Sequence, residues 1–226
     1  MAKKVILASG SPRRKELLSK AGVIFEVHSP DINEEVLHQE RSKPMVKRLS
    51  QEKALEVWRN SLSADQSAII IAADTTVVDP AGKILGKPAN EAEAVKMIKS
   101  LQGKVHQVHT GYTVIDVVRG QVKKKITRVV ETRVWMGSMT PVEIKNYVNH
   151  GECLDKAGAY AAQGFGMLLI EKISGSYTNV IGFREVSGFN VPADMGKKIG
   201  LTDSKPVKCL KMQIAARGAA ICQSCL

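Results

Sequence analysis

The chain has 226 residues, of which 44% are hydrophobic and 24% charged, an ordinary composition for a globular protein. Because no apolar run approaches the roughly 20 residues that a membrane-spanning helix needs, and because the apolar stretch near the start is too short for a secretory signal, we expect a cytoplasmic protein. The net charge of +11 favours an anionic partner, but it does not distinguish nucleic acid, a membrane surface and a phosphorylated small molecule.

The first predicted elements are a strand over residues 4–8 and a helix over residues 12–21 that follows it directly. Between them, Gly10 permits a tight bend, Ser11 suits the helix N-cap and Pro12 suits the first helical position. The helix N-terminus presents free N–H groups beside two guanidinium groups, which indicates a polyphosphate site. An ordinary capped helix with solvated arginines is the alternative. The candidate triphosphate cradle consists of Ser9, Ser11, Arg13 and Arg14.

A short strand over 25–28 and a helix from Pro44 to about Asn60 lead to the next informative segment. The continuous apolar run at 68–73 is typical of a strand that is buried on both faces. Asp74 follows it directly, at the carboxyl end of a strand, where open α/β sheets place their ligands. The alternative is that Asp74 only caps the next turn.

The remaining elements mix helices, hairpins and strands, which favours an α/β fold with a mixed rather than purely parallel sheet. His106 and His109 should face opposite sides of their strand, so their spacing makes no metal pair. The expected elements are a hairpin of 76–79 and 83–85, a helix capped by Asn90 that ends at Leu101, long strands over 104–118 and 121–136, a helix capped by Thr140 that ends near His150, and a strand over about 166–173.

The sequence changes character after residue 182. Residues 183–226 contain seven Lys or Arg and three Asp or Glu, with weak periodicity. Cys222 and Cys225 make half of a zinc site at most, because no second Cys or His pair has a familiar spacing. We therefore divide the chain into a domain of residues 1–182 and an atypical basic tail, with the hypothesis that the tail is a replaced or frame-shifted C-terminus.

Several motifs in the first 182 residues occur in the order of one known family. With its strand–SxSPRR–helix opening, the chain resembles the Maf family of nucleoside triphosphate pyrophosphatases. The resemblance implies an elongated mixed-sheet fold of the Maf/ITPase type, in which two lobes flank a deep nucleotide cleft. The further motifs that carry the resemblance are Ala73-Asp74-Thr75, Gly86-Lys87-Pro88, Asp155-Lys156-Ala157-Gly158-Ala159-Tyr160 with Gln163-Gly164, and Gly175-Ser176-Tyr177-Thr178-Asn179-Val180.

The resemblance also implies roles for individual residues. Asp74 matches the family's general base, and a carboxylate can deprotonate a water that a metal has acidified. Glu34 matches a family acidic residue that would hold Mg²⁺ or Mn²⁺ together with Asp74, although Glu35 is an open alternative. Lys53 and Lys87 match lysines that reach phosphate oxygens, and Lys53 could equally be a surface lysine of its helix.

The base-reading residues are expected to be Thr75 and Gln163, together with Arg13. An Asp-Thr pair, as in Asp74-Thr75, resembles the family branch that hydrolyses dTTP and UTP. The amide of Gln163 offers both a donor and an acceptor, which suits the imide edge of thymine or uracil. Asp155 and the adjacent lysine could form a structural ion pair or part of the cleft.

The leading hypothesis is a metal-dependent pyrophosphatase that converts dTTP, UTP and modified pyrimidine triphosphates to monophosphates and pyrophosphate, in housecleaning or in the restraint of cell division. One alternative is a nucleotidyltransferase-like enzyme, although such enzymes usually have more than one glycine in the phosphate loop. The other is a non-catalytic basic nucleic-acid-binding protein, although no DNA-reading helix or aromatic RNA motif is recognisable. We expect neither nucleic acid nor membrane as a partner, and the family's frequent dimers leave a homodimer open.

Overall fold

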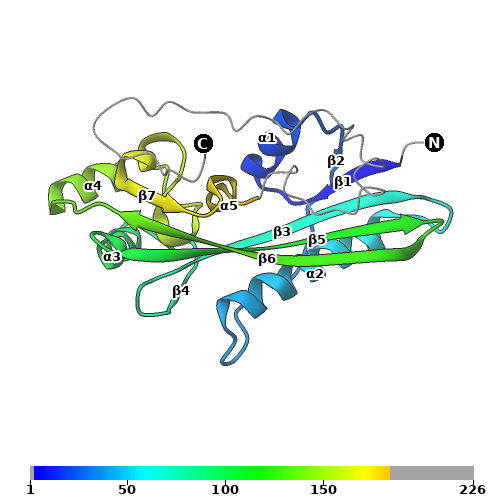
Figure 1. The fold of residues 1–226 in the computed structure, drawn as a ribbon, viewed down its shortest axis with the longest axis horizontal. Coiled ribbons are helices and arrows are strands. Elements are labelled where there is room, and N and C mark those ends of the chain that lie inside the picture. The colour runs from blue at the N-terminus through cyan, green and yellow to red at the C-terminus, as the bar shows by residue number, and fades with distance from the viewer. Residues whose placement is uncertain (1–2, 184–226) are drawn as a thin grey trace.

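A seven-stranded mixed sheet runs along the long axis of the molecule (Figure 1), in the order β2-β1-β3-β5-β6-β7 with β4 paired to β3. The computed structural model describes residues 3–183. The strands are β1 (Lys4–Ala8), β2 (Glu26–Val27), β3 (Ala68–Val78), β4 (Ile84–Leu85), β5 (Val105–Val118), β6 (Gln121–Met136) and β7 (Ile170–Ser174). The predicted α/β class with a mixed sheet is confirmed, because β1 runs parallel to β2 and β3 whereas all other pairs are antiparallel.

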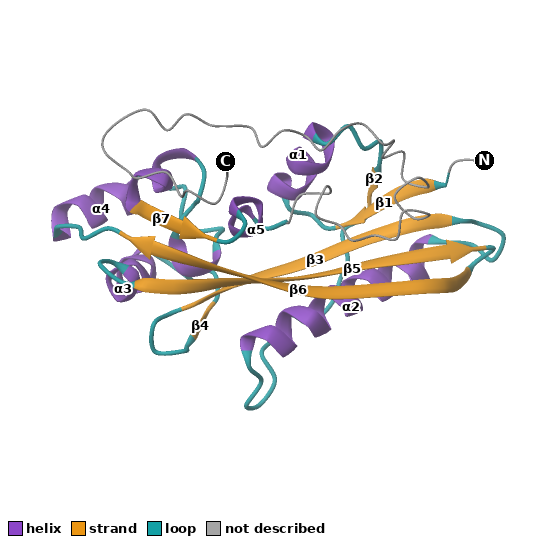
Figure 2. Ribbon diagram, viewed as in Figure 1, coloured by secondary structure: helices purple, strands orange, loops and turns teal. Residues whose placement is uncertain are grey.

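Helices cover both faces of this sheet (Figure 2): α2 lies on one face, and α1 and α5 lie on the other. Along β1 and β3 successive side chains alternate between the two faces, as the pleat requires. One set packs with Leu18 of α1, and the other packs with Ala54 and Val57 of α2. The helices are α1 (Pro12–Lys20), α2 (Ser42–Ser61), α3 (Glu91–Leu101), α4 (Pro141–Asn149) and α5 (Tyr177–Ile181), with 3₁₀ turns η1 (Ala157–Ala159) and η2 (Gly164–Leu169).

A second lobe forms at the other end of the long strands. There α3 and α4 pack with one end of β5 and β6 around a separate apolar core that includes Leu101, Val108, Met136 and Tyr160. The two cores are linked by strands that run through both, which agrees with the expected two-lobed, elongated shape (Figure 1). Among the described residues, no helix is both long and apolar enough to pass through a membrane.

The pairing of β3 changes along its length, and this change positions the site. β1 pairs with β3 only from Ala68 to Ala72, and β4 pairs with it only at Val77 and Val78. On the other side β5 pairs with β3 throughout, with Asp74 opposite Gly111. The stretch of β3 between its two partners is therefore an open edge, and Asp74 lies in it.

Two predicted boundaries are wrong. The strand expected at 68–73 and the first hairpin strand at 76–79 are one continuous strand, β3, because β5 pairs with every residue from Ala68 to Val78. The last strand begins at Ile170 rather than near residue 166, because residues 164–169 form the 3₁₀ turn η2, and the short helix α5 was not expected.

The predicted helix caps are largely confirmed. The side chains of Asn90 and Thr140 accept hydrogen bonds from the backbone N–H three residues on, and Thr140 forms a full capping box with Glu143. Ser11 occupies the N-cap of α1 but makes no side-chain cap bond. The first turn of α1 therefore keeps donors that its own side chains do not satisfy.

The predicted tail at 183–226 lies outside the described residues except for Phe183. This last described side chain is 1% exposed and packs in the core beside α1. Its N–H donates to Thr178 O at 2.9 Å. Cys222 and Cys225, the candidate half-site for zinc, also lie outside the described residues.

Close contact between α2 and the sheet makes a testable prediction at Gly111. A Cβ at this position would lie 2.1 Å from the backbone oxygen of Val46 in α2. Gly111→Ala should therefore lower the free energy of unfolding by about 1–3 kcal/mol, as expected for overpacking, measured by urea denaturation. The control is Gly86→Ala, where a Cβ meets nothing within 4 Å and the change should stay within about 0.5 kcal/mol. Equal stability of the two variants would contradict this packing.

Candidate active site

One cleft of about 670 Å³ gathers most of the residues that the sequence singles out. It opens at the unpaired edge of β3, between the N-terminus of α1, the middle of α2 and the loop after β4. Nine of the ten predicted site residues line it: Ser9, Ser11, Arg13, Arg14, Glu34, Lys53, Asp74, Thr75 and Lys87.

Gln163, the tenth, is not brought to the cleft. It is the N-cap of η2 and is absent from the residues that line the cavity. Only part of the motif that begins at Asp155 therefore contributes to the cleft. Asp155, Lys156, Ala157 and Tyr160 line the cleft, whereas Gln163 lies beyond it.

A buried cation of the cleft is Lys53, near the middle of α2. Its Nζ lies 2.6 Å from Asp74 Oδ1 and 2.9 Å from Glu34 Oε1. Lys53 is 5% exposed and Asp74 6%, whereas the Glu34 side chain is 58% exposed. One buried ammonium thus joins a buried carboxylate to one at the mouth of the cleft. Loss of either member of the buried pair leaves an uncompensated charge, which is strongly destabilising.

The two neighbouring glutamates, Glu34 and Glu35, make different contacts. Glu34 contacts Lys53 and lines the cleft. The Glu35 carboxylate accepts a hydrogen bond from the side chain of Asn33 and is not part of the cleft lining. The arrangement favours Glu34 over Glu35 as the acidic residue that works with Asp74.

The carboxylates set a limit on metal binding. Within residues 3–183 no group of three or more His, Cys, Asp or Glu side chains could hold a metal ion. Glu34 and Asp74 come together at Lys53 and supply only oxygen ligands. Mg²⁺ is commonly held by one or two carboxylates, substrate phosphates and water. The donor set therefore fits a hard divalent ion that binds together with a polyphosphate.

The cleft lining includes two further cations, Lys87 and Lys156. Lys87 is exposed in the loop after β4, and this loop is tied to η1 because Gly158 N donates to Gly86 O at 3.0 Å. Lys156 forms an ion pair with Asp155, and both line the cleft. The alternatives considered for these two residues, an ion pair and a place in the cleft, are thus both correct.

Sequence reasoning missed the apolar and aromatic parts of the cleft. Met45 and Leu49 of α2 and the α5 residues Val180 and Ile181 line it. Tyr160 also lines it, with its hydroxyl 2.7 Å from His106 Nε2. Tyr160 belongs to a motif that the resemblance singled out, whereas an apolar helix residue such as Leu49 gives no signal beyond ordinary core packing.

His106 and His109 face opposite sides of β5, as predicted. His106 contacts Tyr160, and His109 Nδ1 lies 2.8 Å from Ser42 Oγ at the start of α2. Both are almost fully buried, at 1% and 3% exposure. Burial lowers the pKa of His106 to about 4 and also lowers the pKa of His109, with Glu131 opposing the shift.

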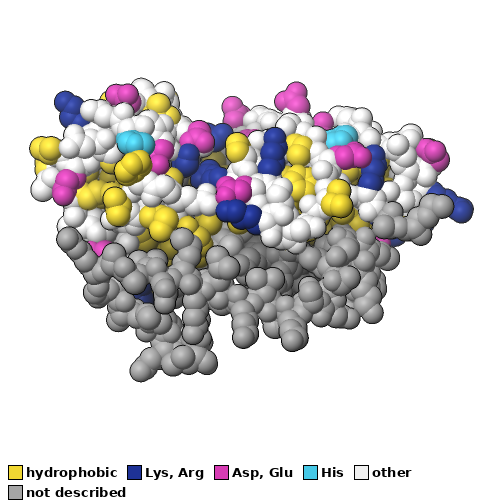
Figure 3. Space-filling model, turned by 90° about the horizontal axis from the view of Figure 1, so that it is seen from above, with side chains coloured by type: hydrophobic (Ala, Val, Ile, Leu, Met, Phe, Trp, Pro, Cys, Tyr) yellow, Lys and Arg dark blue, Asp and Glu magenta, His cyan; other side chains and the backbone are white. Residues whose placement is uncertain are grey.

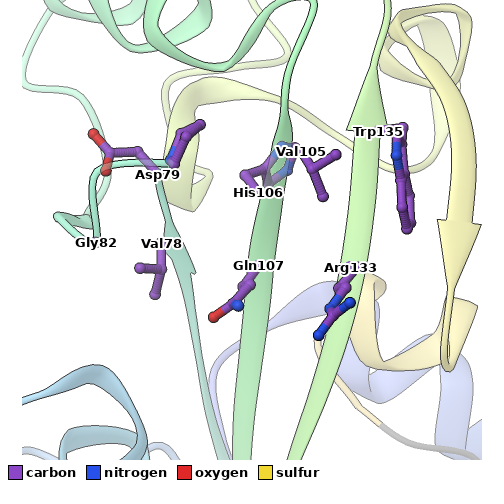
Figure 4. A pocket seen from close by; sticks show the side chains of 9 residues that line it. Val78, Asp79, Gly82, Val105, His106, Gln107, Arg133 and Trp135 are labelled. Atoms are coloured by element: carbon purple, nitrogen blue, oxygen red, sulfur yellow. The ribbon is translucent and has the colours of Figure 1, made fainter.

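A second hollow, of about 450 Å³, lies on the sheet where β5 begins and β6 ends (Figure 4). None of the predicted site residues lines it. Its walls include Asp79, Gln107, Arg133 and Trp135, and Lys172 Nζ lies 5.0 Å from the Trp135 ring centroid. Every predicted site residue that lines either of these two cavities thus lines the first cleft.

On the face seen in Figure 3, basic and acidic side chains are interspersed along the molecule. Among the described residues visible on that face, the basic side chains do not form the continuous surface with which a duplex-binding protein follows a phosphate backbone.

Comparison with known proteins agrees with these motifs. The family model described as Maf-like protein matches residues 4–186. The dTTP/UTP pyrophosphatase of Caldanaerobacter subterraneus subsp. tengcongensis is 46% identical over 179 residues, which cover 79% of this chain and 83% of that protein. The dTTP/UTP pyrophosphatase of Alkaliphilus oremlandii is 44% identical over 180 residues, which cover 80% of this chain and 90% of that protein. A nucleoside-triphosphatase (dITP/XTP pyrophosphatase) structure from Mycobacterium abscessus has 14% identity and a TM-score of 0.36 over 59% of this chain and 72% of that chain, a likeness too weak to bear on the site.

The buried His106 beside the cleft gives a prediction about pH. Its pKa of about 4 in the folded protein lies below the value of about 6.5 in an unfolded chain. Its contribution to stability is therefore fully present above pH 6.5 and is lost as the pH falls towards 4, by about 3 kcal/mol. His106→Gln should remove this part of the acid sensitivity in urea denaturation between pH 7 and 4. The control His38→Gln, at an exposed position, should leave the pH dependence unchanged, and a wild-type profile in His106→Gln would refute the assignment.

Proposed function

The chain belongs to the family of Maf-like proteins, and we propose that it hydrolyses dTTP and UTP to the nucleoside monophosphate and pyrophosphate. The observation that carries this proposal is the cleft in which Asp74, held by Lys53, faces the cationic N-terminus of α1. The substrate preference comes from relatives named dTTP/UTP pyrophosphatase that are 41–46% identical to this chain. The same proposal includes modified pyrimidine triphosphates as further substrates.

The triphosphate would bind among the cationic groups that line the cleft. The first N–H groups of α1 have no acceptor within the helix, and the helix dipole there favours negative charge. Arg13 lies in the same turn, and Lys87 and Lys156 line the same cleft. Electrostatic positioning of this kind supplies most of the rate enhancement in phosphoryl chemistry.

Asp74 is the residue that would accept a proton from the attacking water. The water oxygen bonds to the α-phosphorus, the bond from that phosphorus to the α,β-bridging oxygen breaks, and pyrophosphate leaves with the electron pair. Lys53 orients the Asp74 carboxylate through its 2.6 Å contact. A divalent ion at Glu34 and Asp74, Mg²⁺ or Mn²⁺, would neutralise phosphate charge and acidify the water.

Several finer assignments belong to the same proposal on other grounds. The cytoplasmic location is proposed from the sequence itself, the homodimer from the family resemblance, and the division of the chain at residue 182 from the change of composition and the end of the family motifs. The resemblance further implies that Arg13, Thr75 and Gln163 read the base, and of these we carry forward Arg13 and Gln163, because the Thr75 hydroxyl is engaged by Arg14 and Thr110. Of these three side chains, Gln163 lies outside the cleft lining.

A nucleotidyltransferase remains the second candidate, because it too would hold a triphosphate beside a helix N-terminus. It differs in needing an acceptor other than water. Release of pyrophosphate from dTTP with only Mg²⁺ and water present supports hydrolysis, whereas release that begins only after a sugar phosphate is added supports the transferase.

The proposed general base gives the sharpest test of activity. Asp74→Asn keeps the size of the side chain but removes its ability to accept a proton, so kcat for pyrophosphate release should fall by about 10²–10⁴-fold. The matched control is Asp65→Asn, an exposed carboxylate in the loop between α2 and β3 that contacts Ser63. Its kcat should equal that of the wild-type protein. Full activity in Asp74→Asn would rule out the proposed base.

The proposed metal site gives a separate prediction. Glu34→Gln should raise the Mg²⁺ concentration for half-maximal activity by about tenfold or more, since weakened metal coordination typically costs this much. Glu35→Gln is the control and should leave the Mg²⁺ dependence unchanged, because Glu35 contacts Asn33 instead of Lys53. Removal of divalent ions with a chelator should abolish turnover in all variants. If Glu35→Gln raised the Mg²⁺ concentration for half-maximal activity and Glu34→Gln did not, the metal site would lie at Glu35 instead.

A further inference from the structure

Two adjacent arginines at the start of α1 make very different contacts. Arg13 lines the cleft, and no hydrogen bond from its guanidinium to another described residue is found. Arg14 lines it as well, but its guanidinium donates from all three nitrogens to protein groups: Nε to Gly182 O at 2.8 Å, Nη1 to Ser9 Oγ at 3.0 Å and Nη2 to Thr75 Oγ1 at 3.2 Å. The sequence alone treats these arginines as equivalent, whereas the structure separates them.

The contacts of Arg14 continue as a chain of hydroxyl groups. Thr75 Oγ1 lies 2.8 Å from Thr110 Oγ1, and Thr110 donates to the backbone oxygen of Asn179 at 3.3 Å. Each hydroxyl has a single proton. If Thr110 gives its proton to Asn179, it accepts from Thr75, and Thr75 in turn accepts from Arg14. The hydroxyl proton of Thr75 is therefore used inside the protein, directed to Thr110 or to Gly182 O at 3.4 Å.

This chain crosses the place where the sheet lacks a strand. β1 stops pairing with β3 at Ala72 and β4 begins only at Val77, so Asp74 and Thr75 have a strand partner on one side only. Arg14 reaches this open edge from α1 and connects it to Ser9 at the end of β1 and to Gly182, the C-cap of α5. It supplies the lateral support that a neighbouring strand supplies elsewhere.

We infer that Arg14 and Thr75 act together as positioning residues, which hold the Asp74 segment of β3 in register with the phosphate-binding turn, and that the Thr75 hydroxyl does not read the base. This inference rests on the proposed function, since it concerns the alignment of Asp74 for the attack on the α-phosphorus. Among the described residues the Arg13 guanidinium has no hydrogen-bond partner, and we assign to it the binding of phosphate.

The first experiment compares Arg14→Lys with Arg13→Lys in steady-state pyrophosphate release from dTTP. Lysine keeps the charge but cannot make three divergent hydrogen bonds. Arg14→Lys should lower kcat by about 10–100-fold and change KM by less than about threefold, because misplacement of a catalytic group by about 1 Å costs up to about 10²-fold. Arg13→Lys should instead act mainly on KM. A rise in KM with unchanged kcat for Arg14→Lys overturns the inference.

The second experiment uses milder changes and remains decisive where Arg14→Lys fails to fold. Thr75→Val removes the hydroxyl and Thr75→Ser keeps it. In Thr75→Val, the kcat for dTTP, UTP and dCTP should fall by the same factor, so that the preference among the three nucleotides is unchanged. In Thr75→Ser, kcat should remain close to that of the wild-type protein. A changed dTTP-to-dCTP preference in Thr75→Val means that Thr75 reads the base, which overturns the inference.

A stability measurement separates failure of this inference from failure of the proposed function. Wild-type protein that releases no pyrophosphate from dTTP or UTP refutes the proposed function. The Arg14–Thr75 link is then judged by urea denaturation of the two single variants and the double variant, Arg14→Lys with Thr75→Val. The loss in free energy of unfolding in the double variant should be smaller than the sum of the losses in the two single variants, because both changes break the same contact. If the changes in free energy of unfolding are additive, the link between Arg14 and Thr75 is refuted, whether or not the protein is active.

Discussion

The site depends on the interrupted pairing of β3. β1 covers the first part of this strand and β4 its last two residues, while β5 continues along the whole length. A strand edge normally leaves unpaired backbone groups that invite another chain. Here the open edge lies at the bottom of a cleft, and the side chains of α1, α2 and the loop after β4 surround it. A ligand can thus approach a residue that is otherwise in the middle of the sheet.

The buried pair of Lys53 and Asp74 makes that edge chemically useful. An isolated carboxylate at 6% exposure would be costly, and the ammonium 2.6 Å away compensates it. The same ammonium also contacts Glu34 at the mouth of the cleft. Arg14 holds the neighbouring Thr75 from the other face of the sheet. The two faces of β3 thus contribute different support to one short segment: an ion pair on the side of α2 and a network of neutral acceptors on the side of α1.

Much of the site could be predicted because its residues lie in short motifs beside recognisable elements. Asp74 follows an apolar strand, and the Ser9–Arg14 motif leads into a capped helix. The contact between Lys53 and Asp74 could not be derived from local pattern, since it depends on how α2 lies across the sheet. The inward turn of Arg14 and the displacement of Gln163 from the cleft are likewise tertiary effects. The continuous strand β3 was missed because polar residues interrupt its apolar run, although its pairing with β5 is unbroken.

Water that attacks the α-phosphorus beside Asp74 leaves its oxygen atom on the nucleoside monophosphate, so the position of the new oxygen atom tests the proposed reaction most directly. The protein would be incubated with dTTP and Mg²⁺ in water enriched in ¹⁸O, and the products would be analysed by mass spectrometry. The label should appear in the phosphate of thymidine monophosphate and not in pyrophosphate. Label in pyrophosphate, or release of orthophosphate in place of pyrophosphate, would contradict the proposed reaction.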